Sequence, residues 1–260
     1  MRFKTGLIHP PHTIRRARRM MVMARHLDKL GSPPETGFAW HDQVEKQVGG
    51  PDKWGMLLND QLGDCVIADD LHFLMVCLAN GSGPFRMPSD GDAEALYERI
   101  AGYVPGDPST DYGTDPSVNL HYMMQTGVLG QTYEAGATID AENANNMMWG
   151  CHIFGGLRFC INCPDIADDM YDRGIWDYNG EPYRIEGGHD IRAVSYDTVD
   201  GEPLWEIVTW GRRIKMTASF WKEFGTSAEA DLASDIITAQ GTAPTGLDIN
   251  AMIADLQAIQ

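Results

Sequence analysis

The sequence predicts an α+β fold with two lobes, and three observations support this prediction. Apolar residues recur at helical spacing through most of the first half of the 260-residue chain, and from residue 157 the period changes towards two, as in strands. Helices followed by strands, rather than alternating with them, are typical of α+β proteins. An apolar fraction of 43% is sufficient for a sizeable core. We therefore expect a helical lobe, an antiparallel β lobe, and a site at the seam between them.

Helices are expected mainly in the first half and at the C-terminus. The best defined covers residues 65–79, because Asp64 is a good N-cap, an apolar stripe follows, and Asn80-Gly81 ends it. The segment before it, residues 33–50, is expected to be an extended connection anchored by Phe38, Trp40 and Val44. The other expected helices are residues 13–30, 92–103, 118–126, 142–149, 217–224 and 248–259.

Strands are expected in the second half, where apolar and polar residues alternate. A hairpin turn is expected at residues 197–202, because it contains Asp200-Gly201. The expected strands are residues 157–162, 190–196, 204–210 and 212–216.

The chain divides into three expected parts: a basic helix and extended arm (residues 1–50), a main domain (51–240), and a linker with a terminal helix (241–260). No run of 18 apolar residues occurs, and the N-terminus lacks the apolar core of a signal peptide. We therefore expect a cytoplasmic protein with no membrane partner. The five cysteines are expected to stay free thiols in a reducing compartment.

The net charge of −17 is distributed unevenly. The first 30 residues carry eight lysines or arginines and one aspartate, so the rest of the chain is strongly acidic. An acidic body repels phosphate backbones, so we expect no nucleic-acid role for the main domain. The basic arm either packs on the acidic body of its own chain or contacts nucleic acid or an acidic protein partner.

Cys65 and His189 carry the chemistry that the sequence suggests. Cys65 opens its helix, where unpaired N–H groups and the helix dipole favour a thiolate. His189 follows two glycines at the start of an expected strand, and histidine is a base with a pKa near neutrality. Each residue also has a simpler explanation, as a buried apolar thiol and a surface turn residue. Together they suggest a nucleophile and its base.

The order of short motifs resembles that of the papain-like cysteine peptidases. The motifs are Gly63-Asp64-Cys65, Gly187-Gly188-His189, Val194-Ser195-Tyr196 and Thr209-Trp210-Gly211. The pattern is also similar to uncharacterised papain-like proteins of phages and prophages. The resemblance spans residues 54–224 and implies a papain-like two-lobed fold, with Cys65 on the helical lobe and His189 on the β lobe. It also implies host cytoplasm or a virion as the location.

The resemblance implies a mechanism as well. Cys65 attacks a carbonyl carbon, His189 accepts and returns the proton, and a side-chain amide forms an oxyanion hole with the Cys65 N–H. Asn59 lies six residues before the cysteine, where the family has glutamine, whereas Gln61 has the matching side chain but lies four before. Such a donor is worth about 3 kcal/mol in other hydrolases. Gln61 is preferred for its side chain and reach.

One departure concerns the family's third residue, an asparagine that orients the histidine. Val208 stands at that position and cannot hold an imidazole, so the role is vacant or is filled by Thr209 or Asp197. Trp210 is expected to shield the His189 region from water. The departure keeps open an inactive structural or assembly protein of a phage particle, docking through its basic arm.

Other candidate sites are weaker. Cys160 and Cys163, with Cys151 and His152 nearby, lack the paired spacing of a zinc site and are expected to be incidental thiols of a buried strand. His72 lies too far along its helix to be the base for Cys65. No metal or cofactor is expected.

The leading hypothesis is therefore a cysteine hydrolase that acts on a peptide or other amide bond. An acyltransferase on the same scaffold would differ only in what resolves the thioester. The sequence does not specify the substrate, the oligomeric state or the host.

Overall fold

A seven-stranded sheet is the centre of this computed structural model, which describes residues 3–9, 13–239 and 247–259. The strand order is β1-β7-β2-β4-β5-β6-β3, and neighbours are antiparallel except β3, which pairs parallel with β6. The strands are β1 (Tyr133–Ile139), β2 (Leu157–Pro164), β3 (Ile175–Trp176), β4 (Ile185–Val199), β5 (Glu202–Thr209), β6 (Arg212–Met216) and β7 (Gly225–Ala233).

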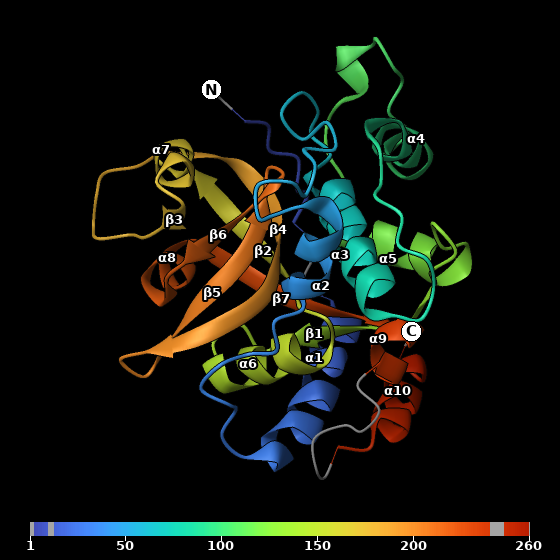
Figure 1. Ribbon diagram of the computed structural model, residues 1–260, viewed down its shortest axis with the longest axis vertical. Helices are drawn as coiled ribbons and strands as arrows, with labels where there is room; N and C mark the ends of the chain where they lie inside the picture. The colour runs from blue at the N-terminus through green and yellow to red at the C-terminus, as the bar shows by residue number, and fades with distance from the viewer. Residues whose placement is uncertain (1–2, 10–12, 240–246, 260) are drawn as a thin grey trace.

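Helices cover both faces of this sheet (Figure 1). The α-helices are α1 (Ile14–Leu27), α2 (His41–Val48), α3 (Cys65–Asn80), α4 (Asp90–Ala101), α5 (Pro116–Gln125), α6 (Ala144–Ile153), α7 (Ala167–Asp172), α8 (Ala218–Phe224), α9 (Ser234–Ala239) and α10 (Ile249–Gln257), and two short 3-10 helices are η1 (Asp28–Leu30) and η2 (Pro108–Thr110).

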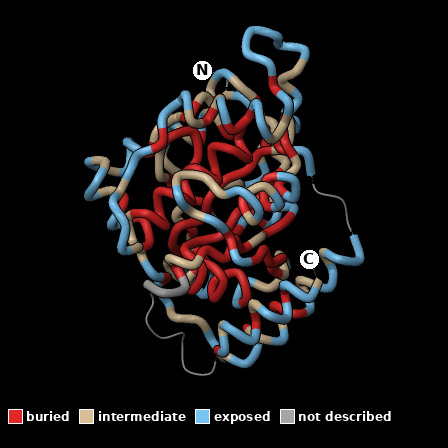
Figure 2. Tube along the Cα trace, turned by 90° about the vertical axis from the view of Figure 1, so that its right-hand side faces the viewer, coloured by how far each residue is buried: buried red, intermediate tan, exposed pale blue. Residues whose placement is uncertain are grey.

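The two faces of the sheet belong to two hydrophobic cores. One core joins α2, α3, α4 and α5 to one face, where Val194 and Val208 point, and the other joins α1, α6, α8 and α10 to the opposite face, where Ala193 and Ile207 point. The strict alternation along a strand explains why neighbouring residues enter different cores. Figure 2 shows the buried residues gathered inside a shell of exposed ones. The α+β fold with a helical part and a β part, as the sequence predicts, is confirmed.

Helix α3 runs through the helical core with every residue from Cys65 to Leu78 buried. A helix that is apolar on most of its faces is stable only in such surroundings. Asp64 occupies the expected N-cap position, but its side chain makes no capping hydrogen bond to the helix. Its carboxylate instead accepts a hydrogen bond from Asn59 Nδ2 at 3.3 Å.

Most expected elements are confirmed, but one segment differs and several elements, among them the short α7, α9 and β3, were not expected. Residues 41–48 form α2 rather than an extended connection. Of the three expected anchors, Trp40 and Val44 are buried in the core, whereas Phe38 is exposed. Strands β1 and β7 were not expected, because their sequences are rich in alanine and glycine, which are poor strand formers. The Asp200-Gly201 turn joins β4 to β5 with positive φ at both residues, as the sequence predicts.

Both ends of the chain pack on the sheet. Helix α1 buries Val22, Met23 and Leu27 in the same core as Met252 and Leu256 of α10. The basic arm therefore lies on its own chain, where Arg16 pairs with Glu229 at 2.8 Å. The expected linker, residues 241–246, lies outside the described residues. In the part of the chain that the structure describes, no helix combines the length and the apolar character needed to cross a bilayer.

Candidate active site

Helix α3 carries Cys65 and strand β4 carries His189, and among the described residues no hydrogen bond joins the two side chains. Cys65 is the first residue of α3, and its sulfur faces the backbone N–H groups of Asp190 and Gly6. The cysteine thus lies against the strand residue that follows His189. Cys65 also belongs to a small cluster of buried side chains, separate from both large cores, with Leu7, Val66 and Cys160.

The His189 ring is fully buried and held on two sides. Its Nε2 lies 2.9 Å from Thr209 Oγ1, and its face stacks on Trp210 with 4.7 Å between ring centroids and 21° between planes. Its Nδ1 has no hydrogen-bond partner among the described residues. Val208 points into the core that contains α3, so the next residue, Thr209, contacts the histidine instead.

Asp197, the other expected orienting residue, is far from the histidine. It lies on the same strand eight residues further along, which places it roughly 26 Å away at the rise of an extended chain. The expectation that Asp197 could hold the imidazole is therefore wrong.

The two expected oxyanion donors have different surroundings. Gln61 is exposed, and its amide is directed to its neighbour Asp60 at 3.4 Å. Asn59 is buried beside the start of α3, where its amide donates to the Leu62 carbonyl and to Asp64. The preference for Gln61 on side-chain identity receives no support from its position.

The N-terminal segment of residues 3–9, which we call the cleft segment, covers the Cys65 region. The Leu7 N–H donates to the Gly188 carbonyl at 2.9 Å, and on the other side the Gly6 carbonyl accepts from the Thr114 N–H at 2.9 Å. His9 Nε2 lies 3.0 Å from Asn162 Oδ1 of β2. Figure 1 shows the dark-blue N-terminal trace running to the sheet beside α3. The segment is thus bonded to both lobes at once.

Glycines allow this close approach. A Cβ on Gly6 would overlap the Gly63 carbonyl oxygen, and one on Gly188 would overlap the Leu7 carbonyl oxygen. The two glycines before His189 are a contact surface for the cleft segment. Glycine is the residue that permits such backbone contacts.

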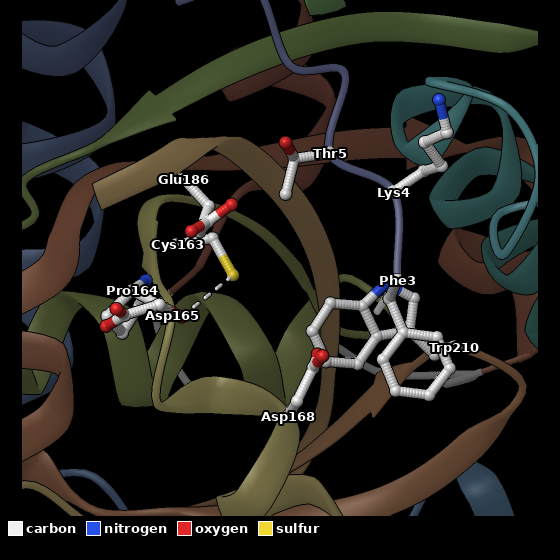
Figure 3. Close-up of a pocket in the computed structure, with 9 residues that line it drawn as sticks. All are labelled: Phe3, Lys4, Thr5, Cys163, Pro164, Asp165, Asp168, Glu186 and Trp210. Carbon is white, nitrogen blue, oxygen red and sulfur yellow. Dashed lines mark hydrogen bonds between the residues drawn. The ribbon is translucent and has the colours of Figure 1, made fainter. Parts of the chain in front are cut away.

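Phe3 extends the cover to Trp210. The two rings stack with centroids 4.3 Å apart and 14° between planes, and the Phe3 N–H donates to the Asp168 carboxylate. A cavity of about 650 Å³ lies next to this pair, with Cys163 and Glu186 on its far side. Figure 3 shows the Phe3 ring lying over the indole at one side of the cavity.

Comparison with solved structures identifies the architecture. Xylellain, a cysteine protease from Xylella fastidiosa, superposes with a TM-score of 0.58 at 12% identity, covering 89% of this chain and 98% of that chain. The fold is that of papain-like cysteine proteases. Procathepsin B of Trypanosoma congolense matches with a TM-score of 0.54 at 12% identity, over 89% of this chain and 87% of its own. Bromelain of Ananas comosus, in complex with E64, matches with a TM-score of 0.52 at 11% identity, over 76% of this chain and 99% of its own. No family model and no curated protein sequence matches the chain.

Burial determines the protonation of both groups in this papain-like fold. Desolvation, followed by the charge of Asp190, raises the pKa of the Cys65 thiol well above its ordinary value. Burial lowers the pKa of His189 to about 3. The thiolate expected from the helix start is therefore not favoured in the covered state, because loss of water outweighs the effect of the helix terminus.

Three of the strained residues and two of the unpaired polar atoms lie in the His189 region and in the loop packed against it. Leu57, Leu58 and Trp210 have positive φ values of 55°, 68° and 45°, and the turn at Gly211 packs against the loop that contains the two leucines. Trp210 Nε1 lacks a partner among the described residues, as His189 Nδ1 does. Strain and unsatisfied polar groups of this kind mark functional sites more often than ordinary core.

A buried ionic network lies beneath the site. Arg192 pairs with Asp69 of α3 and with Asp231 of β7, the latter at 3.0 Å. Arg158 pairs with Asp70 at 2.7 Å and with Asp190 at 2.6 Å. The network thus joins the cysteine helix to strands β2, β4 and β7. Among the described residues, Asp69, Asp70 and Asp231 are the one acidic group close enough to hold a cation, but guanidinium groups already neutralise them.

The remaining candidates have structural surroundings. The five cysteines are free and buried, and Cys160 lies on β2 with its sulfur 3.6 Å from Asp190 Oδ1. His72 Nε2 contacts the Gly55 carbonyl at 3.0 Å from inside the helical core.

The cleft segment was not found by sequence analysis. Its contacts are long-range and mainly to backbone atoms, so no local side-chain motif in the sequence predicts them. The signal present in the sequence is a set of glycines at 6, 63, 113, 187 and 188, each of which lies in the cleft segment or against it.

Proposed function

We propose that the protein is a cysteine peptidase in which Cys65 is the nucleophile and His189 the general base and acid. The thiol gives its proton to His189 Nδ1, and the sulfur attacks the carbonyl carbon of an amide. The C–N bond then breaks, and the amine leaves with the proton from the imidazolium. Water attacks the thioester, releases the acid and restores the thiol.

The observation that carries this proposal is the arrangement of the His189 ring. Thr209 occupies Nε2 at 2.9 Å and Trp210 covers the ring face, which leaves Nδ1 as the nitrogen available for a proton. Thiol catalysis needs a base held in one orientation, and the proposal requires the Cys65 sulfur to reach Nδ1 of this ring once the site is open.

Asn59 is the better candidate for the side-chain oxyanion donor. It is buried beside the start of α3, whereas Gln61 points to Asp60 in solvent. The second donor is the Cys65 backbone N–H, since N–H groups in the first turn of a helix have no partner within the helix.

The cleft segment makes the described chain a covered form of this peptidase. Residues 3–9 lie over Cys65 and bond to both lobes, so a peptide substrate needs the segment to leave. Procathepsin B, among the structures that superpose, is by its name a precursor form. A peptide is the substrate class that the proposal implies.

The inactive phage-particle alternative rested on Val208 and on the split charge with its basic arm. The Thr209 contact with His189 weakens the first support, and the packing of α1 on its own chain weakens the second. A phage origin and a place in host cytoplasm or virion stay hypotheses drawn from motif resemblance. An acyltransferase would use the same residues, with an amine in place of water.

Casein hydrolysis tests the proposal. Gly6→Val should detach the cleft segment, because the added side chain overlaps Gly63, and should release peptides faster than the unchanged chain. Adding Cys65→Ser to Gly6→Val should abolish that release. Equal hydrolysis by both variants, or no hydrolysis by Gly6→Val, would refute peptidase activity at Cys65.

A further inference from the structure

A second cavity lies away from the cysteine, between α1 and α5. Its volume is about 590 Å³, and α1 contributes the side chains of Arg15, Arg16 and Arg19 to its wall. The opposite wall comes from α5, and Glu229 of β7 also lines the cavity. None of these residues takes part in the proposed reaction.

The charge of this cavity is opposite to that of the molecule. Three guanidinium groups face one carboxylate, in a chain whose net charge is −17. Glu229 is engaged with Arg16 at 2.8 Å. The cavity therefore keeps an excess of positive charge from Arg15 and Arg19, which lie four residues apart and so share one face of the helix.

Arg19 is the least satisfied of these cations. Its Nε atom is buried and has no hydrogen-bond partner among the described residues. Burial, together with the neighbouring charges of Arg15 and Arg16, lowers its pKa although Glu229 opposes the change. A desolvated cation with an unused N–H is stabilised by an anion that accepts from it.

The opposite wall is largely apolar. Val118, Leu120 and Met124 of α5 line it, with His121 beside them. A ligand that fits both walls has an anionic group at one end and an apolar body at the other.

We propose that this cavity binds a small organic anion, in which a phosphate monoester or a carboxylate meets Arg15 and Arg19 and an apolar body lies against α5. The guanidinium fork suits both anions. Because α1 belongs to the N-terminal arm and α5 to the helical lobe, such a ligand holds the arm to the body. The inference does not depend on peptidase activity.

Binding is measured on the full chain by isothermal titration calorimetry with phenyl phosphate, benzoate and inorganic phosphate at constant ionic strength. Phenyl phosphate or benzoate should bind more tightly than inorganic phosphate, and the tighter of the two identifies the anionic group. Arg19→Gln should weaken that binding about tenfold or more. The control is Arg18→Gln, on the same helix but outside the cavity wall.

Three results would overturn the proposal. No binding of either aromatic anion at 10 mM-scale concentrations, about the weakest range for a specific site, would exclude it. Equal weakening by Arg18→Gln and Arg19→Gln would show that the loss of affinity comes from the lower positive charge of the helix and not from a contact in the cavity. Equal affinity for inorganic and phenyl phosphate would exclude the apolar contact. If Arg19→Gln fails to fold, Arg15→Gln, whose side chain is exposed, takes its place with the same expected loss.

Discussion

His189 engages one ring nitrogen within the fold and leaves the other free. The Thr209 hydroxyl lies 2.9 Å from Nε2, and the Trp210 stack stops the ring from turning. At this scale the proposed chemistry depends on a single hydroxyl, which stands one residue after the position where the resemblance placed an asparagine.

Thr209→Val removes that hydroxyl and keeps the shape of the side chain. In the Gly6→Val background we expect kcat on casein-derived peptides to fall about tenfold to a hundredfold, the equivalent of one lost hydrogen bond to a buried group. Thr209→Ser should retain most of the activity. An unchanged kcat for Thr209→Val would show that the hydroxyl does not orient the base.

Asn59 and Gln61 make a second test at the residue scale. In the same background Asn59→Ala should lower kcat by about a hundredfold, the usual effect of removing one oxyanion donor, while Gln61→Ala should change it little. Because Asn59 also bonds Asp64, thermal unfolding of both variants is measured in parallel. A loss confined to Gln61→Ala would reverse the assignment.

Among the elements of the fold, the cleft segment controls access to Cys65. Its backbone bonds to Gly188 and Thr114 join it to both lobes, and Gly6 and Gly188 permit contacts that any side chain would prevent. The Phe3 ring on Trp210 and the buried Leu7 side chain add to these backbone contacts, but a side chain at Gly6 would overlap the Gly63 backbone, so we expect one substitution there to displace the segment around Cys65.

Gly6→Val should therefore raise the rate of Cys65 alkylation by iodoacetamide at pH 7 by at least about tenfold, since uncovering the thiol restores its solvation. Peptide mass spectrometry measures the rate at Cys65 separately from the other cysteines. The matched control is Gly83→Val, where a Cβ meets no atom within 4 Å. Equal rates in all three proteins would mean that the segment does not protect the cysteine.

For the whole molecule, the buried ionic network sets how stability depends on pH. Burial raises the pKa of Asp70 to about 6, despite the opposing charge of Arg158. The folded state therefore holds a proton that the unfolded chain releases near pH 4. The stability that this proton contributes is present at low pH and is lost as pH rises through about 6. Desolvation also raises the pKa of Asp64, Asp190 and Glu229, which act in the same direction.

Asp70→Asn should remove part of this pH dependence. We expect the variant to be more stable than the unchanged chain above pH 7, by at most about 3 kcal/mol, since each pKa unit corresponds to about 1.4 kcal/mol. Asn119 Oδ1 has no partner among the described residues and is available to the new amide after a flip. Urea unfolding at pH 5 and pH 8 measures the difference. Greater destabilisation of the variant at pH 8 than at pH 5 would contradict the raised pKa.

Much of the fold, but less of the site, follows from the sequence. Helix α3 and strands β2, β4, β5 and β6 carry clear periodicity, whereas β1 and β7 are specified by long-range pairing of small residues. Cys65 and His189 were found because their motifs are local. The cover over them was not, since residues 3–9 meet partners more than 50 residues away, and its burial reverses the thiolate expected at the helix start.

The pH profile of Cys65 alkylation tests the central claim, that Cys65 and His189 act as a pair. It is measured by mass spectrometry in Gly6→Val and in Gly6→Val with His189→Ala. The account predicts rapid labelling that persists well below pH 7 in the first protein and collapses in the second. Slow labelling with a midpoint at about pH 8.5 in both proteins, the pKa of an ordinary thiol, would contradict the account.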